Sequence, residues 1–125
     1  ASVLELGLST MAVDIVPRWF GPSVCEQQPA LVEGWRVIMG RGDNRSYALL
    51  CEMLGRVDFR EMLSEQRVPL RLVGGSDDVA TPPDTLRALA DASGAAEPVI
   101  LEQVGHVPSV ECPDKLTQIL VNNLA

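Results

Sequence analysis

No run of apolar residues in this sequence approaches the roughly 20 positions that a membrane-spanning helix needs. The N-terminus also lacks the basic patch, apolar core and cleavage site of a signal peptide. We therefore expect a cytoplasmic protein without a membrane partner. Basic residues are scarce too, with 10 Lys and Arg against 17 Asp and Glu and a net charge of −7. Because so few cations cannot form a basic stripe along a phosphate backbone, we expect no nucleic-acid partner.

Cysteine is too rare and too irregularly spaced to build a stabilising framework. Cys25, Cys51 and Cys112 are an odd number, and none of them belongs to a C-x-x-C pair. A disulfide scaffold and a zinc site are therefore disfavoured. We expect all three to be reduced, partly buried thiols that serve as packing residues.

The composition is that of a globular domain, with 46% hydrophobic and 22% charged residues in 125 positions. Before residue 67, apolar residues recur at spacings of three or four, which is typical of one face of a helix. Pro17 should disturb the first helix near its end, and Pro29 stands at the start of the second. We expect four short amphipathic helices whose apolar faces need a surface to cover. Their stripes are Leu4, Leu8, Met11, Ile15 and Trp19; Leu31, Trp35, Ile38 and Met39; Tyr47, Leu50, Cys51 and Leu54; and Phe59, Met62 and Leu63.

After residue 67 the pattern changes to alternating strands and helices. Residues 68–73 and 99–104 are short apolar runs that predict parallel strands. Between them, Thr81 followed by two prolines predicts a helix with Thr81 as its N-cap, and Gly94 marks the end of that helix. A last helix is expected from about residue 113. Its inner side is predicted to carry Leu116, Ile119, Leu120 and Leu124.

This β-α-β-α pattern is incomplete as an independent fold. Two parallel strands are too few for a stable open sheet, which typically has about five. We therefore interpret residues 67–125 as the edge of a larger parallel sheet in an α/β fold, and residues 1–66 as a helical segment that covers part of it.

Candidate chemistry lies in the loops that follow the two predicted strands. Asp77 and Asp78 follow the first strand, and His106, the sole histidine, follows the second. The carboxyl ends of parallel strands meet at one edge of a sheet, where α/β folds place their sites. An Asp that accepts the Nδ1 proton of a His fixes the tautomer and lets Nε2 face a substrate. The alternative is structural, since aspartates at strand ends often close turns and a lone histidine often serves packing.

Four stretches of the sequence form recognisable motifs: G-G-S-D-D-V-A-T-P-P, G-H-V-P-S-V-E-C-P, V-P-R-W-F-G-P and S-Y-A-L-L-C-E-M-L. The first two resemble the C-terminal third of the α/β-hydrolases, where the triad acid lies in a G-x-x-D-x-x-x-P-like setting and the triad histidine in a G-H-x-x-x-x-E-x-P setting. The last two resemble the helical cap of the 3-oxoadipate enol-lactonases. The resemblance implies the C-terminal part of an α/β-hydrolase fold, with residues 1–66 as a helical cap segment and residues 67–125 as part of the core.

The resemblance also implies two catalytic residues. Aligned on the Thr81-Pro82 step, the family's acid corresponds to Asp78, which orients His106 as the general base and acid. Asp77 is then a solvated neighbour or a turn residue.

Two residues of the cap segment are implied to contact the substrate. Trp19 lines an apolar cleft, and the guanidinium of Arg18 binds the carboxylate of an enol-lactone. The alternatives are that Trp19 is a core aromatic and Arg18 a solvated charge at a helix end. Trp35 and Tyr47 fall on the helical stripes and are interpreted as packing residues.

The nucleophile of the family is missing from this sequence. It lies in a G-x-S-x-G elbow, whereas the nearest serines, Ser9 and Ser76, lack that motif. The resemblance therefore implies a hydrolase of a carboxylic ester or lactone in aromatic catabolism, whose serine comes from a second chain or fragment and which uses no metal or organic cofactor. The alternatives are an inert truncated fragment that self-associates through its sheet edge and cap face, and a related C–C bond hydrolase or carboxylesterase.

Overall fold

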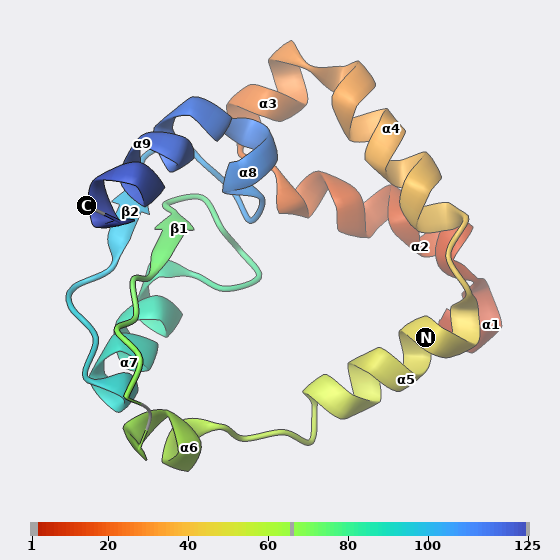
Figure 1. The fold of residues 1–125 in the computed structure, drawn as a ribbon. Coiled ribbons are helices and arrows are strands. Elements are labelled where there is room, and N and C mark those ends of the chain that lie inside the picture. The colour runs from red at the N-terminus through yellow and green to blue at the C-terminus, as the bar shows by residue number, and fades with distance from the viewer. Residues whose placement is uncertain (1–2, 66, 125) are drawn as a thin grey trace.

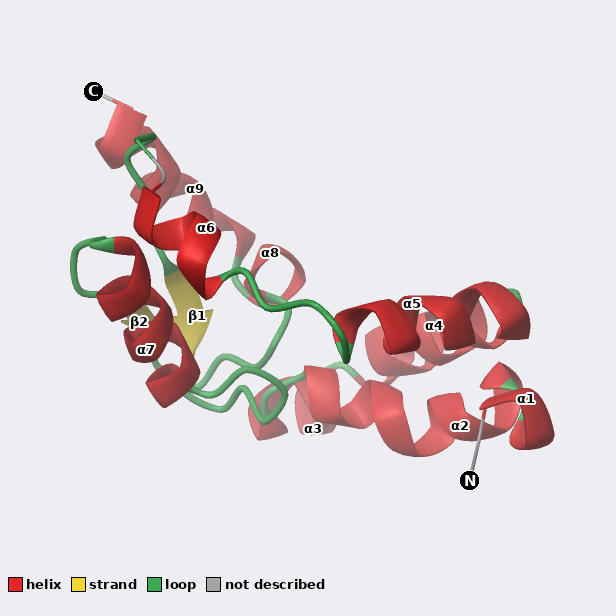
Figure 2. Cartoon of the chain, turned by 90° about the horizontal axis from the view of Figure 1, so that it is seen from below, coloured by secondary structure: helices red, strands yellow, loops and turns green. Residues whose placement is uncertain are grey.

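The computed structural model describes residues 3–65 and 67–124, which form mostly helices and one small sheet (Figure 1). The N-terminal elements are α1 (Val3–Leu6), α2 (Leu8–Ile15), the 3-10 helix η1 (Val16–Trp19), α3 (Pro22–Gln27), α4 (Pro29–Gly40), α5 (Asn44–Leu54) and α6 (Arg60–Glu65). The C-terminal elements are β1 (Val73–Gly75), α7 (Pro83–Ser93), β2 (Val99–Leu101), α8 (Pro108–Glu111) and α9 (Pro113–Leu124). In Figure 2 helices α1 to α5 lie to one side of the sheet and its helices, and loops connect the two groups.

The first predicted helix is divided into three parts. Gly7, at a φ of 76°, separates α1 from α2, and Pro17 lies in the 3-10 turn η1. Because proline has no N–H for the α-helical hydrogen-bond pattern, the α-helix gives way there to a 3-10 turn, which is the disturbance that the sequence predicted at Pro17. The short helices α3 and α8 were not predicted. Each begins with a proline, and each is too brief for a periodic apolar pattern to reveal it.

The core of the helical half lies mainly between α2, η1, α3 and α4. Its most buried residues in the first segment are Leu8, Ala12, Val16 and Phe20, which follow one another at intervals of four. The predicted stripe through Met11, Ile15 and Trp19 is only half-buried. The buried face is therefore turned by one residue relative to the prediction, because Ala12 and Val16 belong to the core cluster that contains Val32 and Met39 of α4. Leu4 of the same predicted stripe is 61% exposed, since α1 is a separate helix.

The sheet consists of β1 and β2, which pair in parallel with Val73 opposite Val99 and Gly75 opposite Leu101. Both strands are shorter than predicted, and the first is displaced toward its C-terminal end. It starts at the residue where the predicted strand 68–73 stops, and Val68 is 69% exposed. The reason is that a strand forms only where a partner lies beside it, and β2 runs beside residues 73–75.

Helix α7 covers the sheet and ends at Gly94, whose φ of 67° is the left-handed conformation predicted for a C-cap glycine. Helix α6 packs on α7 rather than on α1 to α5. Helix α9 begins at Pro113 as expected, with Leu116 and Ile119 half-buried. Its buried face is narrower than predicted because Leu120 is exposed. The side chain of Leu124 lies outside the described residues. The division of the chain at residue 66 stays a prediction.

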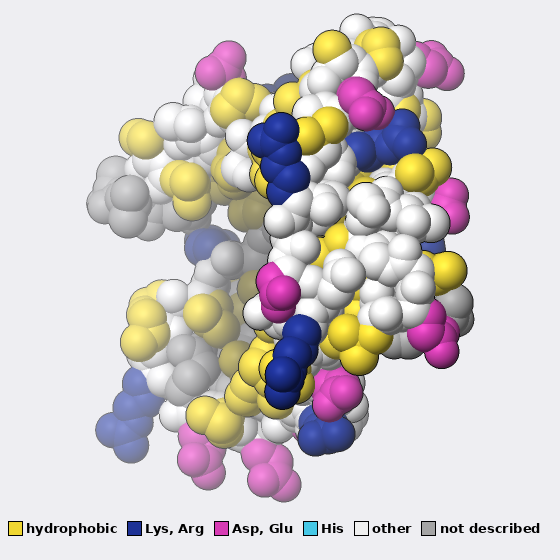
Figure 3. Space-filling model, turned by 90° about the vertical axis from the view of Figure 1, so that its right-hand side faces the viewer, with side chains coloured by type: hydrophobic (Ala, Val, Ile, Leu, Met, Phe, Trp, Pro, Cys, Tyr) yellow, Lys and Arg dark blue, Asp and Glu magenta, His cyan; other side chains and the backbone are white. Residues whose placement is uncertain are grey.

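Much apolar surface remains exposed, and α5 has no buried residue among its described side chains. Figure 3 shows hydrophobic side chains lying between charged ones of both signs on one face of the molecule. None of the helices in the described ranges has the length and hydropathy that crossing a bilayer requires. The exposed large apolar residues of α5 are Leu49, Leu50, Met53 and Leu54.

Candidate active site

Asp78 and His106 lie side by side at the carboxyl ends of the two strands. Asp78 belongs to the turn after β1, and His106 to the loop after β2. Nδ1 of His106 is 2.9 Å from Oδ2 of Asp78. Because an ionised carboxylate only accepts hydrogen bonds, Nδ1 carries the proton and donates it. Nε2, on the other side of the ring, is then the nitrogen available for proton exchange with a bound molecule.

Asp78 is held in place by the turn that it closes. Its Oδ1 accepts hydrogen bonds from the backbone N–H groups of Ala80 at 2.8 Å and Thr81 at 2.9 Å. Its Oδ2 accepts one from the Thr81 hydroxyl at 2.7 Å, in addition to the bond from His106. Asp78 is 5% exposed. Each oxygen thus has its own set of donors, which fixes the plane of the carboxylate toward the imidazole.

Thr81 does not cap α7, which corrects the prediction. Pro82 occupies the N-cap position, and no side chain bonds to the first turn. The Thr81 hydroxyl donates to Asp78 instead and lies 3.3 Å from Nδ1 of His106. The physical reason is that an N-cap side chain needs free N–H groups in the first turn, and the prolines at positions 82 and 83 have none.

The surroundings of Asp78 act on its pKa in opposite directions. Burial, the largest influence, raises the pKa, whereas hydrogen bonds from Thr81, His106 and Ala80 lower it. The hydrogen bonds together outweigh burial, so the pKa lies below its ordinary value of 3.8. The structure therefore favours the charged form of Asp78, which is the form that accepts the Nδ1 proton.

This shift predicts a specific dependence of stability on pH. Since the folded pKa lies below the unfolded value, Asp78 contributes stability that is fully present above pH 3.8 and is lost as the pH falls through the folded pKa. We expect Asp78→Asn to flatten the fall of the unfolding free energy below that pH. Urea unfolding of both forms over a series of acidic pH values measures this. An equally steep fall in the variant would contradict the assignment.

The loop that carries His106 is attached to the end of η1 by backbone contacts. The N–H of His106 donates to the carbonyl oxygen of Trp19 at 2.7 Å. Gly105 packs so closely that a Cβ on it would lie 2.7 Å from backbone atoms of Trp19, Phe20 and Gly21. Only glycine permits this approach, which places His106 beside the cap segment. The Glu111 side chain joins the same two segments, a contact that the G-H-x-x-x-x-E-x-P motif contained but that sequence reasoning did not interpret.

Asp77 and Ser76 bond to one another and to the loop after β2. The Ser76 hydroxyl donates to Oδ1 of Asp77 at 3.1 Å and accepts from the N–H of Gln103 at 2.8 Å. The N–H of Asp77 donates to the carbonyl of Val104 at 2.9 Å. These bonds connect the loop after β1 to the loop after β2 through residues other than Asp78 and His106. Ser76 is thereby engaged in the turn, and Ser9 lies on the exposed side of α2.

His106 forms part of the wall of an apolar cavity of about 410 Å³. Trp19 lies in that wall, and its ring packs edge-on against Trp35 with the centroids 6.3 Å apart. Its contact with a substrate stays a prediction. Trp35 and Tyr47 also line the cavity, although the sequence suggested packing residues. Both roles hold, because these rings lie at the border between the core and the open space. The cavity is lined by Trp19, Trp35, Tyr47, Leu50, Cys51, Leu54, His106 and Val107.

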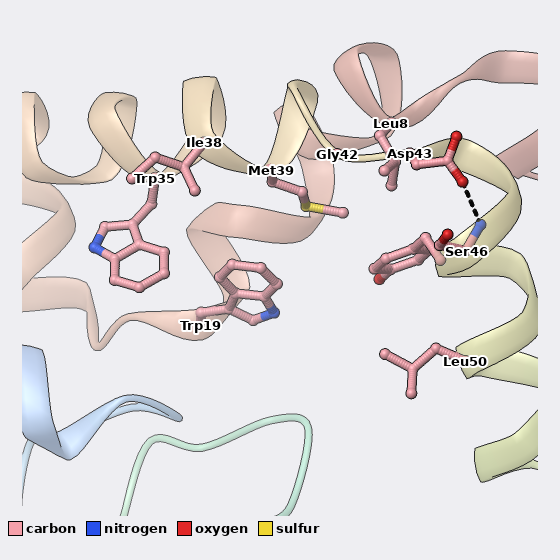
Figure 4. Close-up of a pocket in the computed structure, with 10 residues that line it drawn as sticks. Leu8, Trp19, Trp35, Ile38, Met39, Gly42, Asp43, Ser46 and Leu50 are labelled. Atoms are coloured by element: carbon pink, nitrogen blue, oxygen red, sulfur yellow. Dashed lines mark hydrogen bonds between the residues drawn. The ribbon is translucent and has the colours of Figure 1, made fainter.

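A second cavity of about 330 Å³ continues this space between η1, α4 and α5. Figure 4 shows Trp19, Met39 and Leu50 around it. The one carboxylate in its wall, Asp43, is the N-cap of α5 and accepts the N–H of Ser46 at 2.7 Å. The two cavities share Trp19, Trp35, Tyr47 and Leu50 in their walls, so aromatic and aliphatic side chains form most of the wall of the space next to His106.

Arg18 is not part of either wall. It is exposed and lines a smaller cavity of about 180 Å³ with Ile15, Trp19, Val79 and Ala80. Trp19 lines both this cavity and the one that contains His106. Arg18 and Trp19, the two predicted substrate contacts, are adjacent in the chain, but Arg18 and His106 line different cavities.

The cysteines and acids of the described residues do not gather into a metal site. No group of three or more His, Cys, Asp and Glu side chains with suitable geometry occurs in residues 3–65 and 67–124. The three cysteines are free thiols. Cys25 and Cys112 are half-buried as expected, whereas Cys51 is exposed because the side of α5 that bears it faces the cavity.

The fold matches solved structures over almost the whole chain. An esterase from Thermogutta terrifontis matches with a TM-score of 0.85 at 24% identity, over 98% of this chain and 45% of the esterase. An enol-lactonase from Burkholderia xenovorans matches with a TM-score of 0.83 at 28% identity, over 94% and 45%. A hydrolase from Pseudomonas aeruginosa matches with a TM-score of 0.83 at 21% identity, over 98% and 46%. This chain therefore has the C-terminal part of the α/β-hydrolase fold, as its motifs predicted.

Sequence comparison leads to the same group of proteins. The chain is 30% identical over 116 residues to 3-oxoadipate enol-lactonase 2 of Acinetobacter baylyi, which is 89% of this chain and 41% of that protein. No family model matches the sequence. The chain thus spans less than half the length of the enol-lactonase and of the solved structures that it resembles.

Proposed function

We propose that residues 1–125 supply the acid and the base of a serine-type hydrolase that acts on a carboxylic ester or lactone. The observation that carries this proposal is the 2.9 Å contact between Nδ1 of His106 and the buried Asp78, made at the wall of an apolar cavity. The likeness to an enol-lactonase over 94% of the chain supports the same reaction class.

The proposed chemistry needs a serine from outside these residues. The serine hydroxyl gives its proton to Nε2 of His106 as its oxygen attacks the carbonyl carbon of the substrate. The imidazolium is stabilised by Asp78 and returns the proton to the leaving oxygen, which yields an acyl-enzyme. A water molecule then gives a proton to Nε2 as its oxygen attacks the acyl carbon. The imidazolium returns that proton to the serine oxygen as the bond between this oxygen and the acyl carbon breaks, which releases the acid and restores the serine. The reaction as written requires no metal or organic cofactor.

The exposed apolar surface supports the proposal that a second segment, which carries the serine, packs against these residues. The described part of the sheet has only β1 and β2, and helix α5 exposes Leu49, Leu50, Met53 and Leu54. A larger sheet and its helices would cover these surfaces. A second chain, a further segment or a second copy of this chain are the candidates for the partner. In the last case the protein is an inert, self-associating fragment.

The test is a chimera that joins residues 1–125 to the N-terminal part of an α/β-hydrolase bearing a G-x-S-x-G elbow. We expect the chimera to hydrolyse an aryl ester and to form an acyl adduct on the elbow serine, seen by intact mass. We expect the chain alone to be slower by about 10⁶-fold, the cost of losing a triad serine. A chimera with native helical content that neither turns over nor forms the adduct would overturn the proposal.

Trp19 and Arg18 receive separate roles in this proposal. Trp19 forms the apolar wall that faces the acyl part of the substrate, next to His106. Arg18 binds a substrate carboxylate only if that group reaches past Trp19 into the smaller cavity. The proposal that the substrate is an enol-lactone needs this contact between Arg18 and the carboxylate.

A plain carboxylesterase is the second candidate, and the separation of Arg18 from the His106 cavity favours it. An ester with an uncharged acyl group would fill the apolar space without a cation. The ratio of kcat/KM for an uncharged aryl ester to that for an enol-lactone, measured on the chimera, decides between the two. A ratio well above one supports the carboxylesterase, and a ratio well below one supports the lactonase. A C–C bond hydrolase would turn over neither substrate well.

A further inference from the structure

The carboxylate of Glu111, at the end of α8, accepts hydrogen bonds from backbone N–H groups of the helical half and of the loop that carries His106. Its Oε2 accepts from Gly21 at 2.7 Å and from Gly105 at 3.1 Å. Its Oε1 accepts from Gly105 at 3.0 Å and from Val107 at 3.3 Å. Two of these donors, Gly105 and Val107, are the immediate neighbours of His106 in the chain.

The third donor, Gly21, lies next to the buried core of the helical half. Gly21 is the N-cap of α3, and the residue before it, Phe20, is 4% exposed in the core. The N–H of His106 donates to the carbonyl of Trp19 in the same segment. Residues 105–107 are therefore attached to residues 19–21 by a backbone bond at His106 and by the Glu111 carboxylate on either side of it.

Without Glu111 the N–H groups of Gly105 and Val107 would lose their acceptor, and the bond from the His106 N–H to Trp19 would be the remaining hydrogen bond between this loop and residues 19–21. Gly105 is buried, so its N–H has no ready access to water when the carboxylate is removed. The peptide groups on both sides of His106 would then shift toward other partners, within the space that the close packing of Gly105 allows, and such a shift would reorient the imidazole. Asp78 fixes the imidazole only through Nδ1, and one hydrogen bond leaves the ring free to swing about that contact.

We propose that Glu111 is a positioning residue, which fixes the backbone on both sides of His106 to the Trp19–Gly21 segment and thereby sets the direction of Nε2. Its consequence for catalysis rests on the proposed hydrolase function, but its consequence for the His106 ring does not. Glu111→Gln is the sharpest variant, because the amide keeps one acceptor oxygen and replaces the other with a donor that faces N–H groups.

The first test uses NMR on the 125-residue chain, in which His106 is the only histidine and gives isolated ring resonances. We expect Glu111→Gln to shift the ring resonances and to weaken the signal of the Nδ1 proton shared with Asp78. Glu102→Gln, the same change at an exposed position in the loop after β2, is the matched control and should leave both unchanged. Unaltered His106 resonances in Glu111→Gln would overturn the proposal. So would a general loss of the resonances of α2 and α4, because Glu111 would then hold the whole fold rather than this loop.

The second test measures kinetics on the chimera. A misplacement of about 1 Å in a catalytic group costs on the order of 100-fold in rate, and we expect Glu111→Gln to lower kcat by about that factor. KM should stay close to the unmodified value, because the apolar walls are unchanged. A fall in kcat no larger than that of Glu102→Gln would overturn the catalytic part. If the unmodified chimera is inactive, the hydrolase proposal fails while the NMR result still decides the position of His106.

Discussion

Asp78→Asn will lower kcat of the chimera by about 10⁴-fold, the loss expected when the acid of a Ser-His-Asp triad is replaced by its amide. Asn can still accept the N–H groups of Ala80 and Thr81 through its oxygen, so the turn survives. What changes is the atom at the Oδ2 position, which becomes an N–H₂ donor beside Nδ1 of His106. The imidazole must then carry its proton on Nε2, which can no longer take one from the serine.

The matched control for this prediction is Asp77→Asn at the adjacent position. Its carboxylate accepts the Ser76 hydroxyl, so the change should be mild. His106→Ala should be at least as damaging as Asp78→Asn, since it removes the base itself. The measurement is kcat for aryl ester hydrolysis by the four forms of the chimera. If Asp77→Asn were the crippling change and Asp78→Asn the mild one, the alignment on the Thr81-Pro82 step would be wrong.

Gly75→Ala is expected to give the largest loss of stability, by more than about 3 kcal/mol. A Cβ at Gly75 would lie 1.9 Å from the carbonyl oxygen of Val104 and 2.3 Å from that of Gly105. These are backbone atoms that cannot rotate away, so β1 and the His106 loop would have to separate. The same separation would carry His106 away from Asp78.

Gly34→Ala is the control for this change. Gly34 lies within α4, and a Cβ there meets nothing within 4 Å. Replacing glycine by alanine inside a helix stabilises by about 0.5 to 1 kcal/mol. Urea unfolding of the two variants should therefore move in opposite directions from the unmodified chain. A Gly75→Ala protein as stable as the parent would show that the close contact of β1 with residues 104–105 is absent in solution.

The sequence was most informative where local chemistry decides the structure. Gly94 ends a helix because a left-handed residue is needed there, and Pro113 starts the last helix. The juxtaposition of Asp78 and His106 followed from two parallel strands whose ends meet at one edge. These features depend on short stretches of chain and on a general rule of α/β topology.

Other features depend on contacts between distant segments, and sequence patterns missed them. The length of β1 is set by where β2 lies beside it. The buried side of α2 and η1 is set by their packing on α4, which buries Ala12 and Val16 rather than Met11 and Ile15. The cavity that Arg18 lines, apart from His106, forms between residues 15–19 and residues 79–80. Helical periodicity contains no information about any of these.

The two oxygens of the Asp78 carboxylate have different structural roles, and this affects which catalytic residue is lost first when a hydrolase is no longer under selection for activity. Oδ1 shapes the turn between β1 and α7, whereas Oδ2 faces His106. A gene copy freed from selection for hydrolysis would still need an acceptor at position 78 to build a stable protein, so drift there would be slow. His106 has no comparable architectural duty for its side chain and would be replaced early. In related chains, an Asp or Asn at position 78 without a histidine at position 106 would therefore keep the turn and lack the base.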